Sequence, residues 1–123
     1  MKRSKEYVYK LNGLTYYSGL DITMSFIGGK WKTIILWHLK NNTLRFGELK
    51  KKIPEITEKM LSTQLKGLEE DLLIARKIYA QVPIKVEYTV TDFGKTLLPF
   101  IEIMAKWGKQ IGEKKGNVIE VIK

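Results

Sequence analysis

Apolar residues recur at helical spacing through most of the chain and alternate with polar residues in one later stretch. The segments 20–28 and 30–42 each predict a helix, and the second is apolar on most sides, which is typical of a buried central helix. Residues 46–53 predict a short amphipathic helix. This helix should end before Pro54, because a proline disfavours the helical conformation of the residue that precedes it.

A longer amphipathic helix is predicted from Thr57 to about Asp71. Thr57 is a good N-cap, and Glu58 lies in the first turn, where the helix dipole favours an acid. The leucines of this segment form one apolar stripe at helical spacing, and they are Leu61, Leu65, Leu68 and Leu72. The polar side chains that lie opposite or beside that stripe are Lys59, Ser62, Thr63, Lys66 and Glu70.

The hydrophobic period changes after this helix. Residues 74–80 and 85–90 alternate and are rich in β-branched and aromatic residues, so they predict a two-stranded hairpin. Thr91 is expected to cap a final helix over residues 92–112. Pro99 lies inside that segment and should bend the helix or cost about 3 kcal/mol.

The order of predicted elements indicates an α+β fold that is mostly α: a winged helix-turn-helix with a two-stranded β-hairpin wing. Residues 1–18 are rich in tyrosine and are expected to form an irregular arm that orders on a partner subunit. Residues 19–112 are expected to form the winged-helix domain. The amphipathic tail, residues 113–123, is expected to contribute to dimerisation.

Composition narrows the function classes. The 123 residues carry a net charge of +9, which favours polyanionic partners. No apolar run is long enough to cross a bilayer, and the basic N-terminus lacks the apolar segment of a secretory signal, so we expect a cytoplasmic protein. The absence of cysteine excludes thiol chemistry and cysteine-ligated zinc within the chain. The single histidine, His38, lies in an apolar stretch and is interpreted as a packed residue rather than a ligand.

No sequence motif predicts an enzyme. The chain has no phosphate-binding glycine loop, no H-E-x-x-H motif and no nucleophile elbow, so we predict no catalytic, cofactor or metal site. RNA binding is disfavoured because Tyr79 and Tyr88 are too few for a stacking platform on the strands. A winged helix used as a protein-interaction module, without DNA specificity of its own, stays open as the alternative to a DNA-binding regulator.

In a helix-turn-helix protein the second helix of the pair lies in the major groove, so the polar face of the helix that begins at Thr57 is expected to meet bases and phosphates. Taken singly, each of these positions also fits a solvated surface. Arg76 is expected instead to pair with Glu87 or Glu69 and to support the fold. The residues predicted to contact DNA are Arg45, Lys50, Lys51, Thr57, Lys59, Ser62, Thr63, Lys66, Lys77 and Lys85.

From Leu20 to about Gln110 the chain strongly resembles the HxlR family of winged-helix transcriptional regulators, relatives of the MarR-type repressors. The motifs that carry the resemblance are "GGKW" at 28–31, "RFGEL" at 45–49, "I…KML…L..LE" over 56–69, "VP.KVEY..T" over 82–91 and "T..G..L.P" over 91–99. The resemblance implies a dimeric bacterial or archaeal transcription factor whose wing is the 74–90 hairpin. Many members carry a sensing cysteine near the N-terminus. In this chain Tyr17 stands at that position, so any signal that the protein senses must act without a cysteine thiol.

The resemblance implies a homodimer built by terminal dimerisation helices, and its two-fold symmetry predicts a near-palindromic operator. Apolar residues left over at both ends of the chain also favour association, namely Tyr7, Val8, Tyr9 and Leu14 at one end and Val118, Ile119, Val121 and Ile122 at the other. The positions predicted for the dimer interface are Tyr16, Tyr17, Leu20, Ile101, Met104, Trp107 and Ile111. A small-molecule effector among Tyr16, Tyr17, Trp31, Trp37 and Trp107 is a further hypothesis; packing of these aromatics in the core and interface is its alternative.

Overall fold

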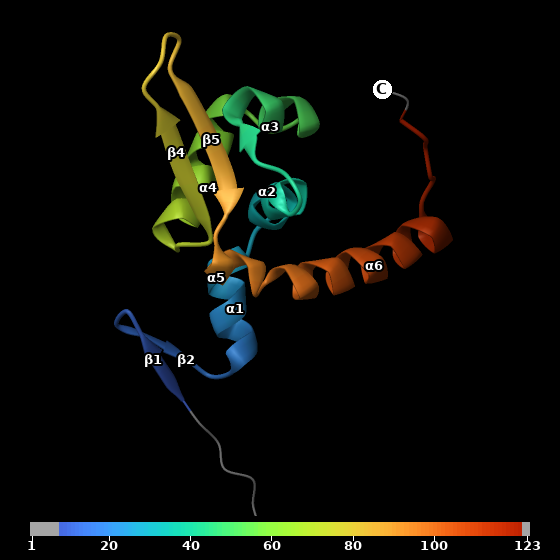
Figure 1. The fold of residues 1–123 in the computed structure, drawn as a ribbon. Coiled ribbons are helices and arrows are strands. Elements are labelled where there is room, and N and C mark those ends of the chain that lie inside the picture. Colours follow the sequence, from blue (N-terminus) through green and yellow to red (C-terminus); the bar gives the residue numbers. More distant parts are fainter. Residues whose placement is uncertain (1–7, 122–123) are drawn as a thin grey trace, which may run out of the picture.

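The computed structural model describes residues 8–121, which form two small antiparallel sheets and six helices (Figure 1). Tyr7 and Ile122, both considered above for dimerisation, lie outside the described residues, as do the first seven residues of the predicted arm. The elements are, in chain order, β1 (Tyr9–Leu11), β2 (Leu14–Tyr16), α1 (Gly19–Ile27), α2 (Trp31–Leu39), β3 (Leu44–Arg45), α3 (Phe46–Lys52), α4 (Glu58–Glu70), β4 (Ile74–Tyr79), β5 (Lys85–Val90), α5 (Asp92–Lys95) and α6 (Leu98–Lys115).

The core forms around α2, as its apolar sequence predicts. This helix packs against α3, α4, α6 and β5. Its Ile35 and Leu36 are fully buried, whereas Trp37 lies at the surface. The other buried apolar side chains are Ile27, Leu39, Leu44, Leu49, Ile53, Ile56, Leu61, Leu65, Leu68, Leu73, Ile74, Val90 and Ile101. Helices α3 and α4 are therefore both fixed on the same central helix.

The wing is a three-stranded sheet in the order β3-β5-β4. The predicted hairpin is present, with Ile74 opposite Val90 and Tyr79 opposite Lys85. The third strand was not predicted, because the two residues of β3 are too short to show a period. Its Arg45 lies opposite Glu87 of β5 and directly precedes α3, so the base of the wing is joined to the start of α3. Helices α3 and α4 with this sheet make the predicted winged helix.

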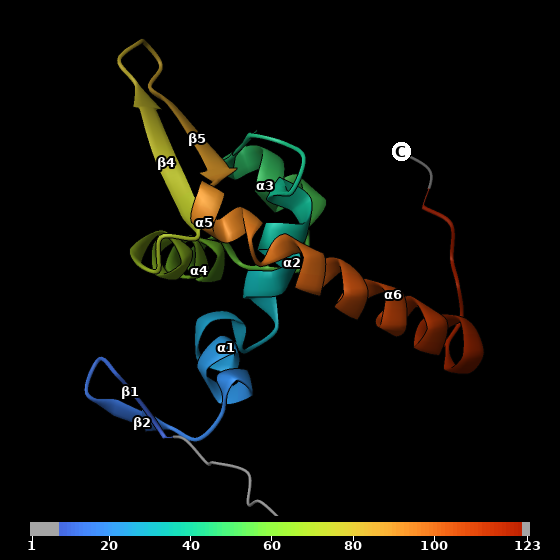
Figure 2. The same cartoon turned by 60° about the horizontal axis from the view of Figure 1, so that its bottom comes forward.

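The prediction of an irregular N-terminal arm is wrong for residues 9–16, which form the β1–β2 hairpin (Figure 2). The two residues between the strands, Asn12 and Gly13, have φ values of 52° and 78°. A two-residue turn with both φ values positive matches the right-handed twist of the flanking strands, and the dipeptide Asn-Gly is its usual sequence. The hairpin is therefore encoded locally by this dipeptide.

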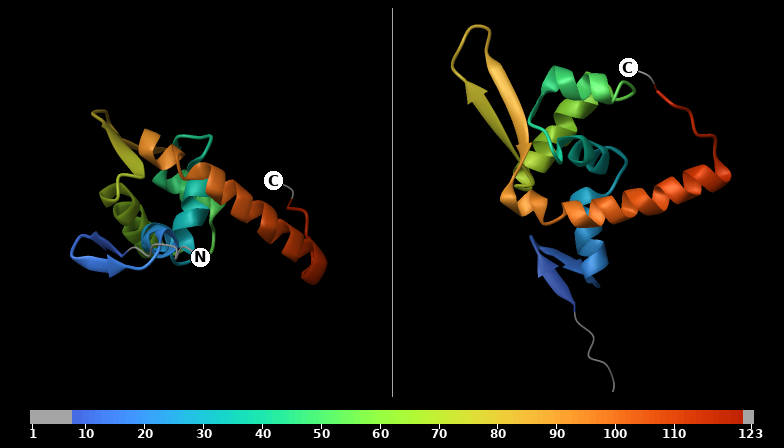
Figure 3. Two further views of the ribbon diagram at one scale, coloured as in Figure 1. Left: turned by 90° about the horizontal axis from the view of Figure 1, so that it is seen from below. Right: turned by 45° about the vertical axis from the view of Figure 1, so that its right-hand side comes forward.

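The single helix predicted over residues 92–112 is two helices. Thr91 caps α5 as expected, since its Oγ1 accepts a hydrogen bond from the Gly94 N at 2.9 Å. Pro99 lies in the first turn of α6, where a backbone N–H is not needed, so the predicted bend or cost inside a helix does not arise. From there α6 continues to Lys115 and extends beyond the other helices (Figure 3).

The buried stripe of leucines on α4 ends one leucine earlier than predicted, at Leu68. Leu73 N donates to Leu68 O and Leu72 N donates to Glu69 O, both at 3.0 Å, which is the Schellman arrangement of a helix C-terminus. It places Leu72 at φ 62° with its side chain 68% exposed. Leu73 takes the buried position in its place. This turn directs the chain from α4 straight into the wing.

Candidate nucleic-acid interface

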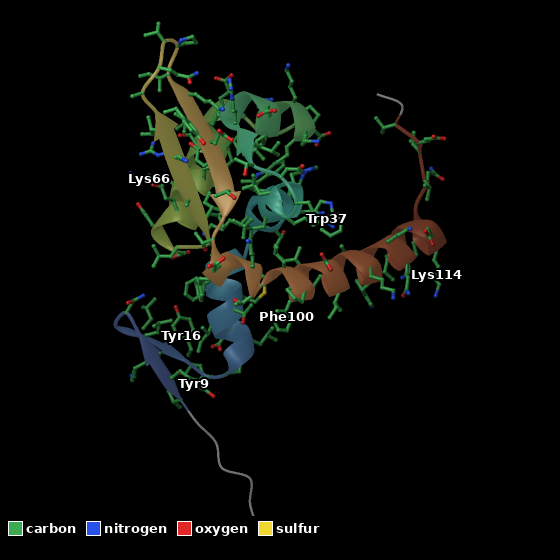
Figure 4. The ribbon with its side chains drawn as sticks, in the orientation of Figure 1. Tyr9, Tyr16, Trp37, Lys66, Phe100 and Lys114 are labelled. Carbon is green, nitrogen blue, oxygen red and sulfur yellow. The ribbon has the colours of Figure 1, made fainter. Side chains whose placement is uncertain are left out.

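One face of α4 is free of contacts with the core. Leu61, Leu65 and Leu68 are buried on the opposite side. The polar face is solvent-exposed along the whole helix and consists of Lys59, Ser62, Thr63, Lys66 and Glu70. Lys66 lies beside the wing (Figure 4). The exposed surface that the sequence predicts is therefore present and is not covered by the described part of the chain.

The hydroxyl groups of α4 are partly committed to the helix itself. Thr57 Oγ1 accepts a hydrogen bond from Met60 N at 3.0 Å and so acts as the predicted N-cap. Thr63 Oγ1 donates to Lys59 O at 2.9 Å. Because its proton is used in this way, Thr63 can offer a base edge its oxygen lone pairs and its methyl group. These suit an amino group of adenine or cytosine and the methyl group of thymine.

The basic residues predicted at and within α3 differ in how free their side chains are to bind a phosphate. Lys50 is half-buried, and its Nζ donates to Pro54 O at 2.9 Å, so it stabilises the turn between α3 and α4. Lys51 is exposed. Arg45 is exposed at the N-cap of α3, where its backbone N donates to Glu48 Oε1 at 2.8 Å. Of these three cations, Arg45 and Lys51 are the freer to meet a phosphate.

Three cations surround one carboxylate on the outer face of the wing. Lys77 and Arg45 both lie opposite Glu87 in the sheet, and Lys85 Nζ is 3.1 Å from Glu87 Oε1. The hydrogen bond from Lys85 is the main reason that the pKa of Glu87 is lowered. Lys77 and Lys85 also lie over the Tyr79 ring, at 4.9 and 4.6 Å from its centroid. Glu87 was considered above as a partner of Arg76, which is wrong because Arg76 lies on the other face of the sheet, and Tyr79 was assigned no role on this face.

The opposite face of the wing turns towards α4 and carries Arg76. Its Nε lies 3.8 Å from Glu69 Oε2, so the expected pairing is made with Glu69. Burial raises the pKa of Tyr88, the residue opposite Arg76, while the charge of Arg76 and a hydrogen bond from it act in the other direction. A groove of about 560 Å³ lies here, lined by Ser62, Leu65, Lys66, Glu69, Glu70, Leu72, Arg76 and Tyr88.

The residues predicted for a dimer interface divide into three groups. Tyr17, Leu20, Met104 and Trp107 are exposed. Tyr16 and Ile111 are half-buried. Ile101 is a correction: it is 4% exposed within the single chain, because the first turns of α6 pack on α2, so it belongs to the core and presents no surface to a partner. On α1 and α6, the exposed apolar side chains that were not predicted for the interface are Met24, Phe100 and Ile103.

A mainly apolar cavity of about 500 Å³ lies between α1, α2 and α6. Its lining is Met24, Ile27, Gly29, Thr33, Ile34, Trp37, Ile101, Met104 and Ala105. Trp37 is the member of the predicted effector set that belongs to this lining; the small-molecule effector stays a prediction. His38 is half-buried and has an interaction partner, in keeping with a packed residue.

Residues 8–121 contain no cluster of three or more side chains able to hold a metal ion. Within the same range, no helix combines the length and apolar character needed to span a bilayer. The features that stand out in the described chain are therefore the exposed face of α4, the basic wing and the apolar surfaces of α1 and α6.

Comparison with known proteins gives a consistent result. A family model described as HxlR-like helix-turn-helix matches residues 26–116. A Fusobacterium mortiferum protein named "Putative regulatory protein MalR" is 52% identical over 96 residues, which are 77% of this chain and 91% of that protein. An uncharacterized HTH-type transcriptional regulator of Methanothermobacter thermautotrophicus is 40% identical over 102 residues, or 83% of this chain and 78% of its own. The redox regulator HypR in its reduced form has a similar structure, with a TM-score of 0.74 at 44% identity over 76% of this chain and 93% of that chain.

Proposed function

Because the chain belongs to the HxlR-like helix-turn-helix family and is a DNA-binding transcriptional regulator rather than an enzyme, we propose that α4 is its recognition helix. The observation that carries this proposal is the exposed polar face of α4 opposite its buried leucines. The 13 residues of α4 make a rod about 20 Å long, and the major groove, about 12 Å wide, accepts one such helix. Lys59 and Lys66 would contact phosphates or guanine, and Ser62 and Thr63 would contact base edges.

The other predicted cations have positional roles in this proposal. Arg45 and Lys51 near α3 would bind the phosphate backbone and fix the register of α4. Lys77 and Lys85 would meet phosphates beside the minor groove from the outer face of the wing. These contacts carry no sequence information, so specificity would come from α4. A regulator of this kind would act in the cytoplasm, where a bacterial or archaeal chromosome lies.

We further propose that two copies associate through α1 and α6. Apolar side chains are exposed on both helices, including Leu20, Met24, Phe100, Ile103 and Trp107, and α6 extends away from the winged helix (Figure 3). Exposed apolar surface of this extent on a small chain favours association. A two-fold dimer would place two α4 helices in successive major grooves, about 34 Å apart, on a near-palindromic operator.

The experiment that tests the DNA proposal is enrichment of bound duplexes from a random library, followed by binding assays over a salt series. If each subunit neutralises three or four phosphates, the logarithm of affinity should fall with the logarithm of salt with a slope of about −6. Lys59→Ala with Lys66→Ala should weaken binding by more than about 1 kcal/mol. No gel shift and no salt-dependent retention on heparin would favour the protein-interaction module instead. Unchanged affinity in the double variant would remove α4 as the recognition helix.

A further inference from the structure

The cation of the wing that faces α4 is Arg76, and not Lys77 or Lys85, which were considered above. Side chains alternate between the two faces of a strand, so Arg76 and Lys77 of β4 lie on opposite faces. Arg76 shares its face with the buried Ile74, and Tyr88 lies opposite it in the sheet. Its Nε is 3.8 Å from Glu69 of α4. Lys77 is therefore turned away from α4, and Arg76 faces the groove between the helix and the wing.

This groove has a cation on each wall. Lys66 comes from the exposed face of α4, and Arg76 comes from β4. Glu69 and Glu70 also line it, so the formal charges in the groove balance. The availability of Arg76 consequently depends on how firmly Glu69, together with the hydrogen bond to Tyr88, holds it. Both side chains are exposed, at 46% and 39%, and Arg76 Nε lies 3.8 Å from Glu69 Oε2, which describes a weak pair.

Resting on the proposed function, we propose that Arg76 binds a phosphate of the DNA strand that crosses this groove, and that Glu69 competes with DNA for it. If α4 lies in the major groove and the wing lies at the next minor groove, the strand that separates those two grooves must pass between α4 and the wing. A phosphate on that strand then meets Lys66 and Arg76 from opposite sides. The guanidinium fork can donate two parallel hydrogen bonds to a phosphate, which Lys66 cannot do.

Neighbouring residues on one strand provide the test. The full-length wild type, Arg76→Gln, Lys77→Gln, Glu69→Gln and the Arg76→Gln/Glu69→Gln double variant are titrated over a salt series with the duplex that the wild type enriches from a random library. Arg76→Gln should weaken binding about tenfold and make the salt slope shallower by about one per subunit. Lys77→Gln removes the lysine proposed above to meet a phosphate from the outer face of the wing; it should also lower affinity, but by less than Arg76→Gln, because a lysine lacks the guanidinium fork. As a single change, Glu69→Gln should strengthen binding about threefold. In the Arg76→Gln/Glu69→Gln double variant, the same change should strengthen binding by less.

Circular dichroism of each variant separates a folding defect from a lost contact, and Arg76→Lys provides a second variant that keeps the charge without the fork. Arg76→Lys should recover part of the salt slope but not the full affinity. A folded Arg76→Gln protein with wild-type affinity and slope would overturn the inference, and so would a larger loss in Lys77→Gln. If Lys59→Ala with Lys66→Ala lowers affinity while Arg76→Gln does not, this inference alone fails. If the wild type shows no salt-dependent binding, the proposed function fails.

Discussion

The hydroxyl of Thr91 lies 2.6 Å from the carbonyl oxygen of Leu72 and joins the end of the wing to the end of α4. The same Oγ1 accepts a hydrogen bond from Gly94 N, and Thr91 N donates to Leu73 O at 3.1 Å. One residue thus connects α4, β5 and α5. The angle between α4 and the wing depends on this junction.

Replacement of Thr91 by valine should therefore destabilise the protein. The valine keeps the shape of threonine but loses the bond to Leu72 and the cap of α5, so the free energy of unfolding should fall by about 1–2 kcal/mol. Urea unfolding monitored by circular dichroism measures the change. Thr96→Val is the control, because its hydroxyl makes one exposed bond to Phe93 O, and it should cost clearly less. Equal losses in the two variants would contradict a special role for Thr91.

Replacement of Leu72 by glycine should stabilise the protein by about 1 kcal/mol. Leu72 has a left-handed backbone conformation at φ 62°, which is costly for a residue with a Cβ and free of strain for glycine. Its exposed side chain gives little burial in return. Leu72→Val should have the opposite effect, because a β-branched residue tolerates this conformation less well. A lower thermal midpoint for Leu72→Gly than for the wild type would show that the strain is not significant.

Replacement of Gly94 by alanine should be among the most harmful single changes in the wing region. A Cβ at this position would lie 2.1 Å from Leu73 O, a backbone atom held by the junction described above. We expect the free energy of unfolding to fall by at least about 2 kcal/mol. Gly67→Ala in α4 is the matched control, because its Cβ would meet only the flexible end of Lys32 at 3.5 Å. The higher helix propensity of alanine should raise the free energy of unfolding of this variant by about 0.5–1 kcal/mol. Similar unfolding curves for the two variants would contradict this contrast.

The contribution of Asp21 to stability should disappear in acid. Its carboxylate accepts hydrogen bonds from Tyr17 N and Ser18 N, each at 2.8 Å, and these bonds, that of Tyr17 foremost, lower its pKa below the usual 3.8. A lowered pKa in the folded state means that the contribution is present above pH 3.8 and is lost as the pH falls through the folded value. Asp21→Asn should thus lower the thermal midpoint at neutral pH, and the two proteins should converge at low pH. A difference that does not change with pH would argue against this origin.

Charges placed on the exposed face of α6 should separate the proposed dimer into monomers. Ile103 and Trp107 are each 66% exposed, so replacing both by glutamate removes little from the core of one chain. A carboxylate left without a partner in an interface is strongly unfavourable. Sedimentation velocity at micromolar concentration should show a monomer for this variant and a dimer for the wild type and for Lys109→Glu, the control on the same helix. A wild-type sedimentation coefficient for the double variant would exclude this face.

The sequence predicted the elements that have several turns or several alternations. The stripe of Leu61, Leu65 and Leu68 spans enough of α4 to define its buried face, and the hairpin from Ile74 to Val90 alternates over six residues in each strand. Once one face of an amphipathic helix must be buried, the opposite face is necessarily exposed. For this reason the surface carrying Lys59 and Lys66 could be located without coordinates.

Features of one to three residues were not predicted, because periodicity carries little information at that length. The strand at Leu44 shows itself only through its pairing with β5. The break before Pro99 required knowledge of where α5 packs, and the burial of Ile101 required the contact between α6 and α2. The N-terminal hairpin is different: Asn12-Gly13 was a readable turn signal that the short flanking strands obscured. Likewise, the face of the wing on which Arg76 lies depends on which side of the sheet meets the core.

The pairing of the short strand β3 with β5 limits the movements that a regulatory signal could cause. It joins the wing to the start of α3, while the Schellman turn and Thr91 join the wing to the C-terminal end of α4. Both helices proposed to lie at the DNA are therefore attached to the same sheet. Because α3, α4 and the wing are joined at these points, they can move together as one rigid body but resist movement relative to one another. In the proposed dimer, we therefore expect an inducing signal to change the distance between the two winged helices and to leave the structure of each winged helix unchanged.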